Sequence, residues 1–250
     1  MKFHIKTFET LDSTNIHMQD MMSENEIEEG FVITADFQTS GKGNSNNAWE
    51  SEKGKNLIFS VLLKPDFIEA ENQFVITQII SLSVLNALSS YTHNKNLKIK
   101  WPNDIYYANK KIAGILIQNT IKGSKISDSV VGIGINVNQE QFISDAPNPV
   151  SLIQIINKET DRDILFKRVL DEIKDCYSRL MLFPNTSWIE RKYLDNFYKK
   201  DELMFFRDKD GVFEGRIQGI DTYGRLIINT VKNEEKIYGF KEVEFILPEL

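Results

Sequence analysis

Cysteine is nearly absent from this sequence, because Cys176 is the only one among 250 residues. A single thiol cannot form an internal disulfide, so we expect the protein to work in the reducing cytoplasm. Cys176 lies inside a segment whose apolar residues recur at helical spacing. A buried structural thiol is therefore a better interpretation than a catalytic nucleophile.

The sequence also lacks a long apolar run, a secretory leader and an excess of basic residues. No stretch approaches the length of a transmembrane helix, so we expect no membrane contact. The formal net charge of −6 argues against a general DNA-binding protein, although it does not exclude a local basic patch. His4, His17 and His93 are scattered, and no zinc, haem or iron–sulfur spacing is present, so we expect no metal held directly by the protein.

What is present is the pattern of a globular protein with a substantial core. The apolar content is 41%, and the length suits one large domain or one domain with a small appendage. Apolar spacing predicts helices at 16–22, 74–91, 150–155, 163–183 and 188–197. Alternation and apolar runs predict strands at 3–8, 31–37, 57–63, 97–101, 105–107, 111–118 and 126–137. Beyond Lys200, short strands at 203–206, 211–220, 224–230 and 236–240 predict a small all-β unit.

The segment 100–116, KWPNDIYYANKKIAGIL, combines unusual requirements in one hairpin. Pro102 cannot donate a ladder hydrogen bond, so it ends a strand and leaves Asn103 and Asp104 free to meet a ligand. Lys111 follows the turn, close to Gly114, where a backbone can approach a substrate. By composition alone this is an ordinary surface hairpin with a basic turn.

Three further segments have both a structural and a functional interpretation. Ser13, Thr14 and Asn15 suit a helix N-cap, and equally a polar site at a helix start. The long loop that begins at Gln38 contains Gly41, Lys42, Gly43 and Asn44 and ends at Trp49, so it is either a flexible linker or a phosphate cradle. Gly132 and Gly134 alternate along a β-branched strand before Asn136, which indicates packing glycines or the close approach of a ligand.

These four segments, in the order in which they follow one another along the chain, resemble the motifs of biotin protein ligases. These are the enzymes that make biotinyl-adenylate and pass biotin to a lysine of a carboxylase. The resemblance implies a biotin site and an ATP site. The implied biotin-binding residues are Ser13, Thr14, Asn15, Gln38, Gly41, Lys42, Gly43, Lys111 and Gly114. The implied ATP or adenylate residues are Asn44, Trp49, Asn103, Asp104, Lys111, Gly132, Gly134 and Asn136, and the implied catalytic residues are Lys111, Lys42 and Asp104. Trp49 has two interpretations: it either anchors the loop to the core or stacks on adenine.

The loop departs from the family pattern, which is Gly-Arg-Gly-Arg followed by one more residue and a glycine. Lys42 stands for the first arginine, Asn44 for the second and Asn46 for the glycine. Lysine lacks the bidentate grip of arginine, whereas asparagine tolerates a left-handed conformation. We therefore expect a looser hold on the adenylate than in an arginine-rich member.

The resemblance also implies a fold, substrates and partners. The fold class is α+β, with a mixed, largely antiparallel sheet backed by helices, related to class II tRNA synthetases, and a small C-terminal β-barrel. The expected domains are a catalytic domain at 1–199 and a barrel at 200–250. Biotin, ATP and Mg²⁺ carried with the ATP are implied, and a biotin carboxyl carrier domain is the acceptor. Because the core begins within the first residues, we expect no N-terminal DNA-binding domain; a homodimer is a weaker expectation.

Two other functions remain open from sequence alone. One is a lipoate or octanoate ligase or transferase of the same architecture, which shares a lysine at a similar place. The other is a non-catalytic biotin or nucleotide sensor, which the missing arginines favour. The run from Trp101 to Asp104 favours biotin over lipoate, and the presence of Lys111 argues against a sensor.

Overall fold

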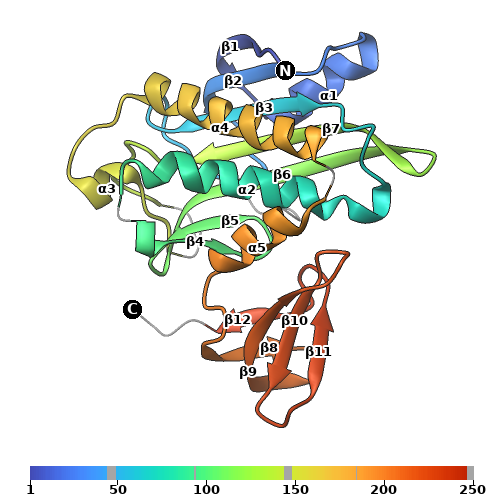
Figure 1. The fold of residues 1–250 in the computed structure, drawn as a ribbon. Coiled ribbons are helices and arrows are strands. Elements are labelled where there is room, and N and C mark those ends of the chain that lie inside the picture. Colours follow the sequence, from blue (N-terminus) through green and yellow to red (C-terminus); the bar gives the residue numbers. More distant parts are fainter. Residues whose placement is uncertain (44–48, 93, 144–147, 184, 247–250) are drawn as a thin grey trace.

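A seven-stranded sheet forms the larger part of the molecule (Figure 1). The computed structural model describes residues 1–43, 49–92, 94–143, 148–183 and 185–246. The strand order of the large sheet is β1-β2-β3-β7-β6-β5-β4. Its strands are β1 (His4–Leu11), β2 (Phe31–Gln38), β3 (Leu57–Leu63), β4 (Leu97–Lys100), β5 (Asp104–Tyr107), β6 (Lys110–Lys122) and β7 (Lys125–Ile135). All neighbouring pairs are antiparallel except β1 and β2, so the predicted mixed, largely antiparallel sheet is confirmed.

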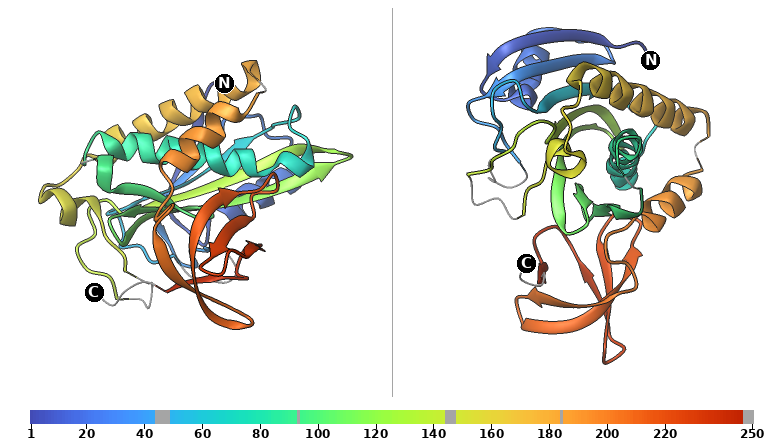
Figure 2. Two further views of the ribbon diagram at one scale, coloured as in Figure 1. Left: turned by 60° about the horizontal axis from the view of Figure 1, so that its bottom comes forward. Right: turned by 90° about the vertical axis from the view of Figure 1, so that its left-hand side faces the viewer.

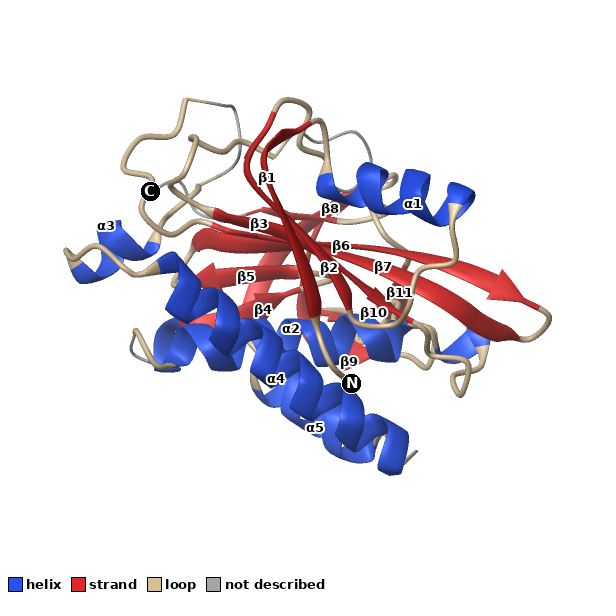
Figure 3. Ribbon diagram, turned by 90° about the horizontal axis from the view of Figure 1, so that it is seen from above, coloured by secondary structure: helices blue, strands red, loops and turns tan. Residues whose placement is uncertain are grey.

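Helices cover the two faces of this sheet unequally. The helices are α1 (Thr14–Glu24), α2 (Phe74–Ser89), α3 (Leu152–Ile156), α4 (Arg162–Leu182) and α5 (Ser187–Asp195), with short 3-10 turns at Ala70–Asn72 and Asn94–Asn96. α2 is buried along most of its length and packs on α4 and on β4, β5 and β6. Figure 3 shows α1 on the side of the sheet opposite α2 and α4. One face is thus closed by helices, whereas the other can hold a site.

The parallel pair β1 and β2 explains where α1 begins. A parallel connection needs a crossover, and α1 supplies it, so the helix starts at the carboxyl end of β1. Ser13 occupies the N-cap position, yet its side chain makes no capping hydrogen bond. The predicted helix at 16–22 is confirmed and begins two residues earlier, at Thr14, with Ser13 as its N-cap by position but without a capping hydrogen bond from its side chain.

The C-terminal part is a second, smaller sheet, which Figures 1 and 2 show below the large one. Its strands are β8 (Leu203–Asp208), β9 (Gly211–Ile220), β10 (Leu226–Thr230), β11 (Glu235–Tyr238) and β12 (Glu244–Ile246). They pair antiparallel in the order β11-β10-β9-β8-β12. The predicted closed barrel is not confirmed, because β11 and β12 form two separate edges in the described residues. The sequence analysis also missed β12, which is too short to give an alternating pattern.

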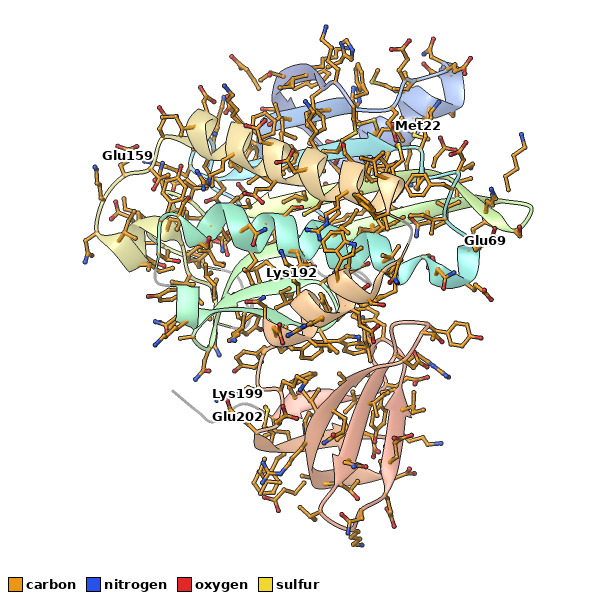
Figure 4. The ribbon with its side chains drawn as sticks, viewed as in Figure 1. Met22, Glu69, Glu159, Lys192, Lys199 and Glu202 are labelled. Atoms are coloured by element: carbon orange, nitrogen blue, oxygen red, sulfur yellow. The ribbon has the colours of Figure 1, made fainter. Side chains whose placement is uncertain are left out.

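A contact of Trp101 connects the two sheets. The indole N–H of Trp101 donates a hydrogen bond of 2.8 Å to the carbonyl of Gly224, in the turn between β9 and β10. Gly224 has φ of +79°, and a Cβ there would collide with the ring of Phe74 at the start of α2. In the connection between α5 and β8, Lys199 and Glu202 form a 2.7 Å ion pair (Figure 4). The Trp101 contact holds the C-terminal sheet directly against the central hairpin.

A partly buried ion pair stabilises the C-terminal sheet, and its removal should destabilise the protein. Asp208, whose side chain is 5% exposed, accepts hydrogen bonds from Lys236 Nζ and Tyr238 Oη. These bonds lower the pKa of Asp208 to about 2, so the stabilisation is present above about pH 4 and is lost as the pH falls toward 2. We expect Asp208→Asn to lower the free energy of unfolding at pH 7 by about 1–3 kcal/mol in urea titrations.

The control for this prediction is Asp210→Asn, because Asp210 is an exposed carboxylate on the same turn. It should leave the unfolding free energy unchanged. The loss caused by Asp208→Asn should also shrink at pH 3. An equal loss at both pH values would contradict the role given to the charge of Asp208.

No helix in the described ranges is long and apolar enough to cross a membrane.

Candidate active site

A cavity of about 650 Å³ opens on the face of the large sheet that carries the start of α1. Most of the residues predicted for the site lie around it. Those that line it are Ser13, Thr14, Asn15, Gln38, Lys42, Gly43, Trp49, Asn103, Asp104, Lys111, Gly114, Gly132 and Gly134. Gly41 and Asn136 do not line it, and Asn44 lies outside the described residues. Segments that are far apart in the sequence therefore meet at one cavity.

Two transverse rows of cross-strand partners form the floor of the cavity. Side chains of directly paired residues point to the same face of a sheet, so each row presents one set of groups to the cavity. The first row crosses β4, β5, β6, β7 and β3 and consists of Lys100, Asp104, Gly114, Gly134 and Ile58. The second row crosses β6, β7 and β3 and consists of Leu116, Gly132 and Ser60. Gly114, Gly134 and Gly132 have no side chains, and the space above them is occupied by Trp49 in the first row and by Asn15 in the second.

A buried polar cluster fills the space above the second row. Ser60 Oγ donates to Asn15 Oδ1 at 2.5 Å and lies 2.8 Å from Thr14 Oγ1, whose hydroxyl can donate to it, and all three residues are at most 4% exposed. The backbone N–H of Thr14 donates to Gln38 Oε1 at 2.7 Å. A Cβ at Gly132 would lie 2.8 Å from Asn15 Cγ, so glycine is required there for Asn15 to keep its place. The cluster offers donors and acceptors at short range in a small volume.

Ser60 was not predicted as a site residue. It lies in the middle of β3, whose other residues are all apolar. A lone hydroxyl in a fully buried strand was the available signal, because a buried polar group needs a partner. Its partners come from Thr14 and Asn15, which are distant in sequence, so the pairing required the fold.

Trp49 occupies the space above the glycines of the first row. A Cβ at Gly134 would lie 2.5 Å from Trp49 Cε2, and one at Gly114 would lie 3.1 Å from Trp49 Cζ3. The backbone N–H of Trp49 donates to the carbonyl of Gly41 at 2.9 Å and so closes the base of the loop. The indole N–H is buried and has no hydrogen-bond partner among the described residues. Trp49 is therefore both an anchor for the loop and a wall of the cavity.

Lys111 and Asp104 form the charged centre of the site. Lys111 Nζ lies 2.7 Å from Asp104 Oδ1 and 5.8 Å from the centroid of the Trp49 ring. Their side chains are 28% and 21% exposed, so both reach the cavity while remaining shielded. Asn103 stands next to them, and its amide donates to the carbonyl of Ile115 and so fixes the turn. This ammonium can neutralise an anion that enters between the two rows.

Asn136 lies behind Lys111, outside the cavity lining. Its amide nitrogen lies 3.1 Å from the carbonyl oxygen of Val150 and 3.5 Å from that of Lys111, and the residue is 3% exposed. Its Oδ1 has no hydrogen-bond partner in the described part of the chain. The predicted contact with adenine stays a prediction; the geometry places Asn136 where it positions the backbone of Lys111.

The C-terminal sheet supplies one wall of the cavity, which the sequence analysis did not foresee in residue detail. The lining residues from this part are Phe240, Lys241, Val243, Glu244 and Phe245. No cluster of three or more histidine, cysteine, aspartate or glutamate side chains with metal-ligand spacing occurs among the described residues. Lysine side chains in the lining supply positive charge to the site, and the polar end comes from α1 and β3.

Comparison with known proteins agrees with this geometry. Residues 7–136 match the model of the biotin/lipoate A/B protein ligase family, and residues 206–244 match the biotin protein ligase C-terminal domain. The bifunctional ligase/repressor BirA of Bacillus subtilis is 29% identical over 240 residues, which cover 94% of this chain and 72% of BirA. Biotin–protein ligase 2 of Arabidopsis thaliana is 39% identical over 129 residues, covering 49% of this chain and 38% of that protein.

A solved structure extends the similarity to nearly the whole chain. The biotin protein ligase from Aquifex aeolicus, solved in complex with biotin and ATP, superposes with a TM-score of 0.78 at 27% sequence identity. The alignment covers 97% of this chain and 98% of the other. The similarity thus includes the C-terminal sheet as well as the large one.

Proposed function

Since the chain belongs to the biotin/lipoate A/B protein ligase family, we propose that it is a biotin–protein ligase, which uses ATP to attach biotin to a lysine of a carrier domain. The observation that carries the proposal is that the polar cluster, Trp49 and the Lys111–Asp104 pair all line one cavity. A molecule with a polar head and a carboxylate tail fits this set of groups. The head would enter the polar cluster, and the tail would reach the ammonium of Lys111.

The polar cluster favours biotin over lipoate or octanoate. The ureido ring of biotin has two N–H donors and a carbonyl acceptor, which match the hydroxyls of Thr14 and Ser60 and the amide of Asn15. The dithiolane ring of lipoate and the methyl end of octanoate offer the cluster no amide donors and no carbonyl acceptor, so they would gain none of these hydrogen bonds. A site built on hydrogen bonds rejects ligands that lack them by large factors, about 10⁴-fold in strong cases.

The nucleotide would lie over the first row. The indole of Trp49 fills the space over Gly114 and Gly134, so the nucleotide would lie against the Trp49 ring, and the unpaired indole N–H can donate to it. Lys111 then lies where the α-phosphate of the nucleotide meets the biotin carboxylate. Mg²⁺ enters with ATP as part of the substrate and offsets the charge of the polyphosphate.

In the first step, a carboxylate oxygen of biotin attacks the α-phosphorus of ATP. The bond from that phosphorus to the bridging oxygen breaks, and pyrophosphate leaves with the electron pair. Both reactants are anions, so the protein must position them and neutralise charge. The ammonium of Lys111, held by Asp104, and the exposed Lys42 at the cavity edge are suited to that task.

In the second step, the ε-amine of the acceptor lysine attacks the acyl carbon of biotinyl-adenylate. The amide C–N bond forms, AMP leaves, and the amine loses a proton. Asp104 can orient the incoming ammonium before that proton is lost, because its carboxylate is accessible from the cavity. The acceptor would be a biotin carboxyl carrier domain of a carboxylase, and the single cysteine supports a cytoplasmic setting.

The direct test is transfer of biotin to a purified carrier domain, followed by intact-protein mass spectrometry. With ATP, Mg²⁺ and biotin, the carrier should gain the mass of one biotinyl group. Changing the acceptor lysine of the carrier to arginine should abolish the gain. A carrier modified by lipoate or octanoate but not by biotin would overturn the proposal.

The loop departures carry a separate prediction about retention of the intermediate. Asn44→Arg should slow the release of biotinyl-adenylate from the purified protein by about tenfold, because arginine offers a forked, charged grip where asparagine offers none. Release can be followed by rapid filtration of protein loaded with radiolabelled biotin and ATP. Asn25→Arg, at an exposed position just after α1, is the control. The prediction would be refuted if the unmodified protein already released biotinyl-adenylate slowly and Asn44→Arg released it at the same rate.

A further inference from the structure

Lys100 ends the first row at the side of the cavity that faces the C-terminal sheet. It is the direct cross-strand partner of Asp104, which in turn pairs with Gly114. Its side chain therefore points to the same face as Asp104, and it lines the cavity. Lys100 belongs to the hairpin that the sequence analysis singled out, yet no function was assigned to it there.

The ammonium of Lys100 has aromatic neighbours and no carboxylate partner. Its Nζ lies 5.3 Å from the centroid of the Tyr106 ring and 4.8 Å from that of Phe245, on β12. Within the described ranges, no carboxylate oxygen lies within ion-pair distance of it; Asp104 pairs with Lys111, and Glu244 pairs with Arg207. Burial, and secondarily the charge of Lys111, lowers the pKa of Lys100, while Asp104 and Glu244 oppose this.

Lys100 is a half-buried cation with two aromatic neighbours, and its charge is not balanced by a counter-ion among the described residues. Aromatic faces stabilise a cation by less than it costs to remove that cation from water without an anion. A ligand that brings negative charge would complete the arrangement. The cavity beside Lys100 is continuous with the place given above to the α-phosphate, so the remaining phosphates of the nucleotide extend toward either this wall or solvent.

We propose that Lys100 binds the pyrophosphate portion of ATP, with Phe245 of the C-terminal sheet holding the ammonium in position. The use of this site in biotin activation rests on the proposed function. The binding of pyrophosphate by Lys100 can be measured independently of that function. It gives the C-terminal sheet a definite part in the first step. Lys111 serves the α-phosphate and the carboxylate, whereas Lys100 serves the leaving group.

Isothermal titration of the full chain with magnesium pyrophosphate, without biotin, tests the proposal. Lys100→Met should weaken binding by about tenfold or more, because it removes a charge-assisted contact while keeping the length of the side chain. Lys98→Met is the matched control, since Lys98 is two residues earlier on the same face of β4 but lines a different cavity and donates to the carbonyl of Asp195. Binding by Lys100→Met within twofold of the unmodified protein would overturn the proposal.

Two further measurements separate a binding role from a structural one. Lys100→Met should raise the KM for ATP by about tenfold, while transfer from added biotinyl-adenylate to the carrier should keep its rate. Phe245→Leu should weaken pyrophosphate binding by about two- to fivefold, because it removes one of the two rings. Equal loss in both half-reactions would assign Lys100 to the fold instead. Pyrophosphate binding through Lys100 in a protein without biotin-dependent activity would reject the proposed function alone.

Discussion

Lys111→Ala should lower biotin-dependent exchange of labelled pyrophosphate into ATP by about a thousandfold. The lysine ammonium is the group nearest to Asp104, at 2.7 Å, and its removal takes away the cation at the junction of carboxylate and α-phosphate. It also leaves the carboxylate of Asp104, which is 21% exposed, without its partner. Two anionic substrates would then meet beside an unpaired carboxylate and without the nearby ammonium, so the chemical step should suffer more than substrate binding.

The matched control is Lys110→Ala, because Lys110 is the exposed neighbour of Lys111 on the same strand. It should retain the exchange rate of the unmodified protein within about twofold. Lys111→Arg should recover part of the activity, since it keeps the charge but has a planar fork in place of a compact ammonium. Equal exchange rates for Lys111→Ala and Lys110→Ala would show that the charge of Lys111 has no part in the reaction.

Two glycine substitutions should separate the two halves of the cavity. Gly132→Ala places a methyl group 2.8 Å from Asn15 Cγ, and Asn15 is held by Ser60, so the polar cluster must shift. We expect biotin affinity to fall by about 100-fold, which corresponds to about 2.7 kcal/mol of overpacking and lost hydrogen bonds. Titration calorimetry with biotin alone measures this.

Gly134→Ala should have the complementary effect. Its methyl group would lie 2.5 Å from Trp49 Cε2, so the indole must leave the first row and the surface offered to the nucleotide changes. We expect the KM for ATP to rise by about tenfold or more while biotin affinity changes by less than twofold. Gly219→Ala is the control for both, because a methyl there meets Leu194 at an ordinary 3.6 Å. If Gly132→Ala and Gly134→Ala both weakened binding of the same ligand, the assignment of biotin to the second row and of the nucleotide to the first would be wrong.

The motifs were predictable from sequence because each is local. Pro102 ends a strand by its own chemistry, and Gly132 and Gly134 mark close approach by lacking a side chain. The meeting of these segments at one cavity followed from the family resemblance, and the structure places thirteen of the predicted residues around it.

What could not be predicted depends on pairings between distant segments. Ser60 finds its hydrogen-bond partners only because β3 lies beside the start of α1. Lys100 has its second aromatic neighbour only because β12 places Phe245 next to it. The contact of Asn136 with the carbonyl of Val150 depends on the fold in the same way, while its predicted contact with adenine stays a prediction. The open edges of the C-terminal sheet depend on strand pairing, which short strands specify weakly. The expected homodimer and the expected absence of DNA binding stay predictions.

The most direct measurement of the central claim is pyrophosphate exchange with the purified full chain, using biotin, lipoate and octanoate in parallel. We predict exchange with biotin alone, because the polar cluster of Thr14, Asn15 and Ser60 can hydrogen-bond the ureido ring, whereas the other two acids offer it no matching group. Exchange with lipoate or octanoate in place of biotin would contradict that account of the cluster. No exchange with any acid, in protein shown to be folded, would contradict the account of Lys111 as well.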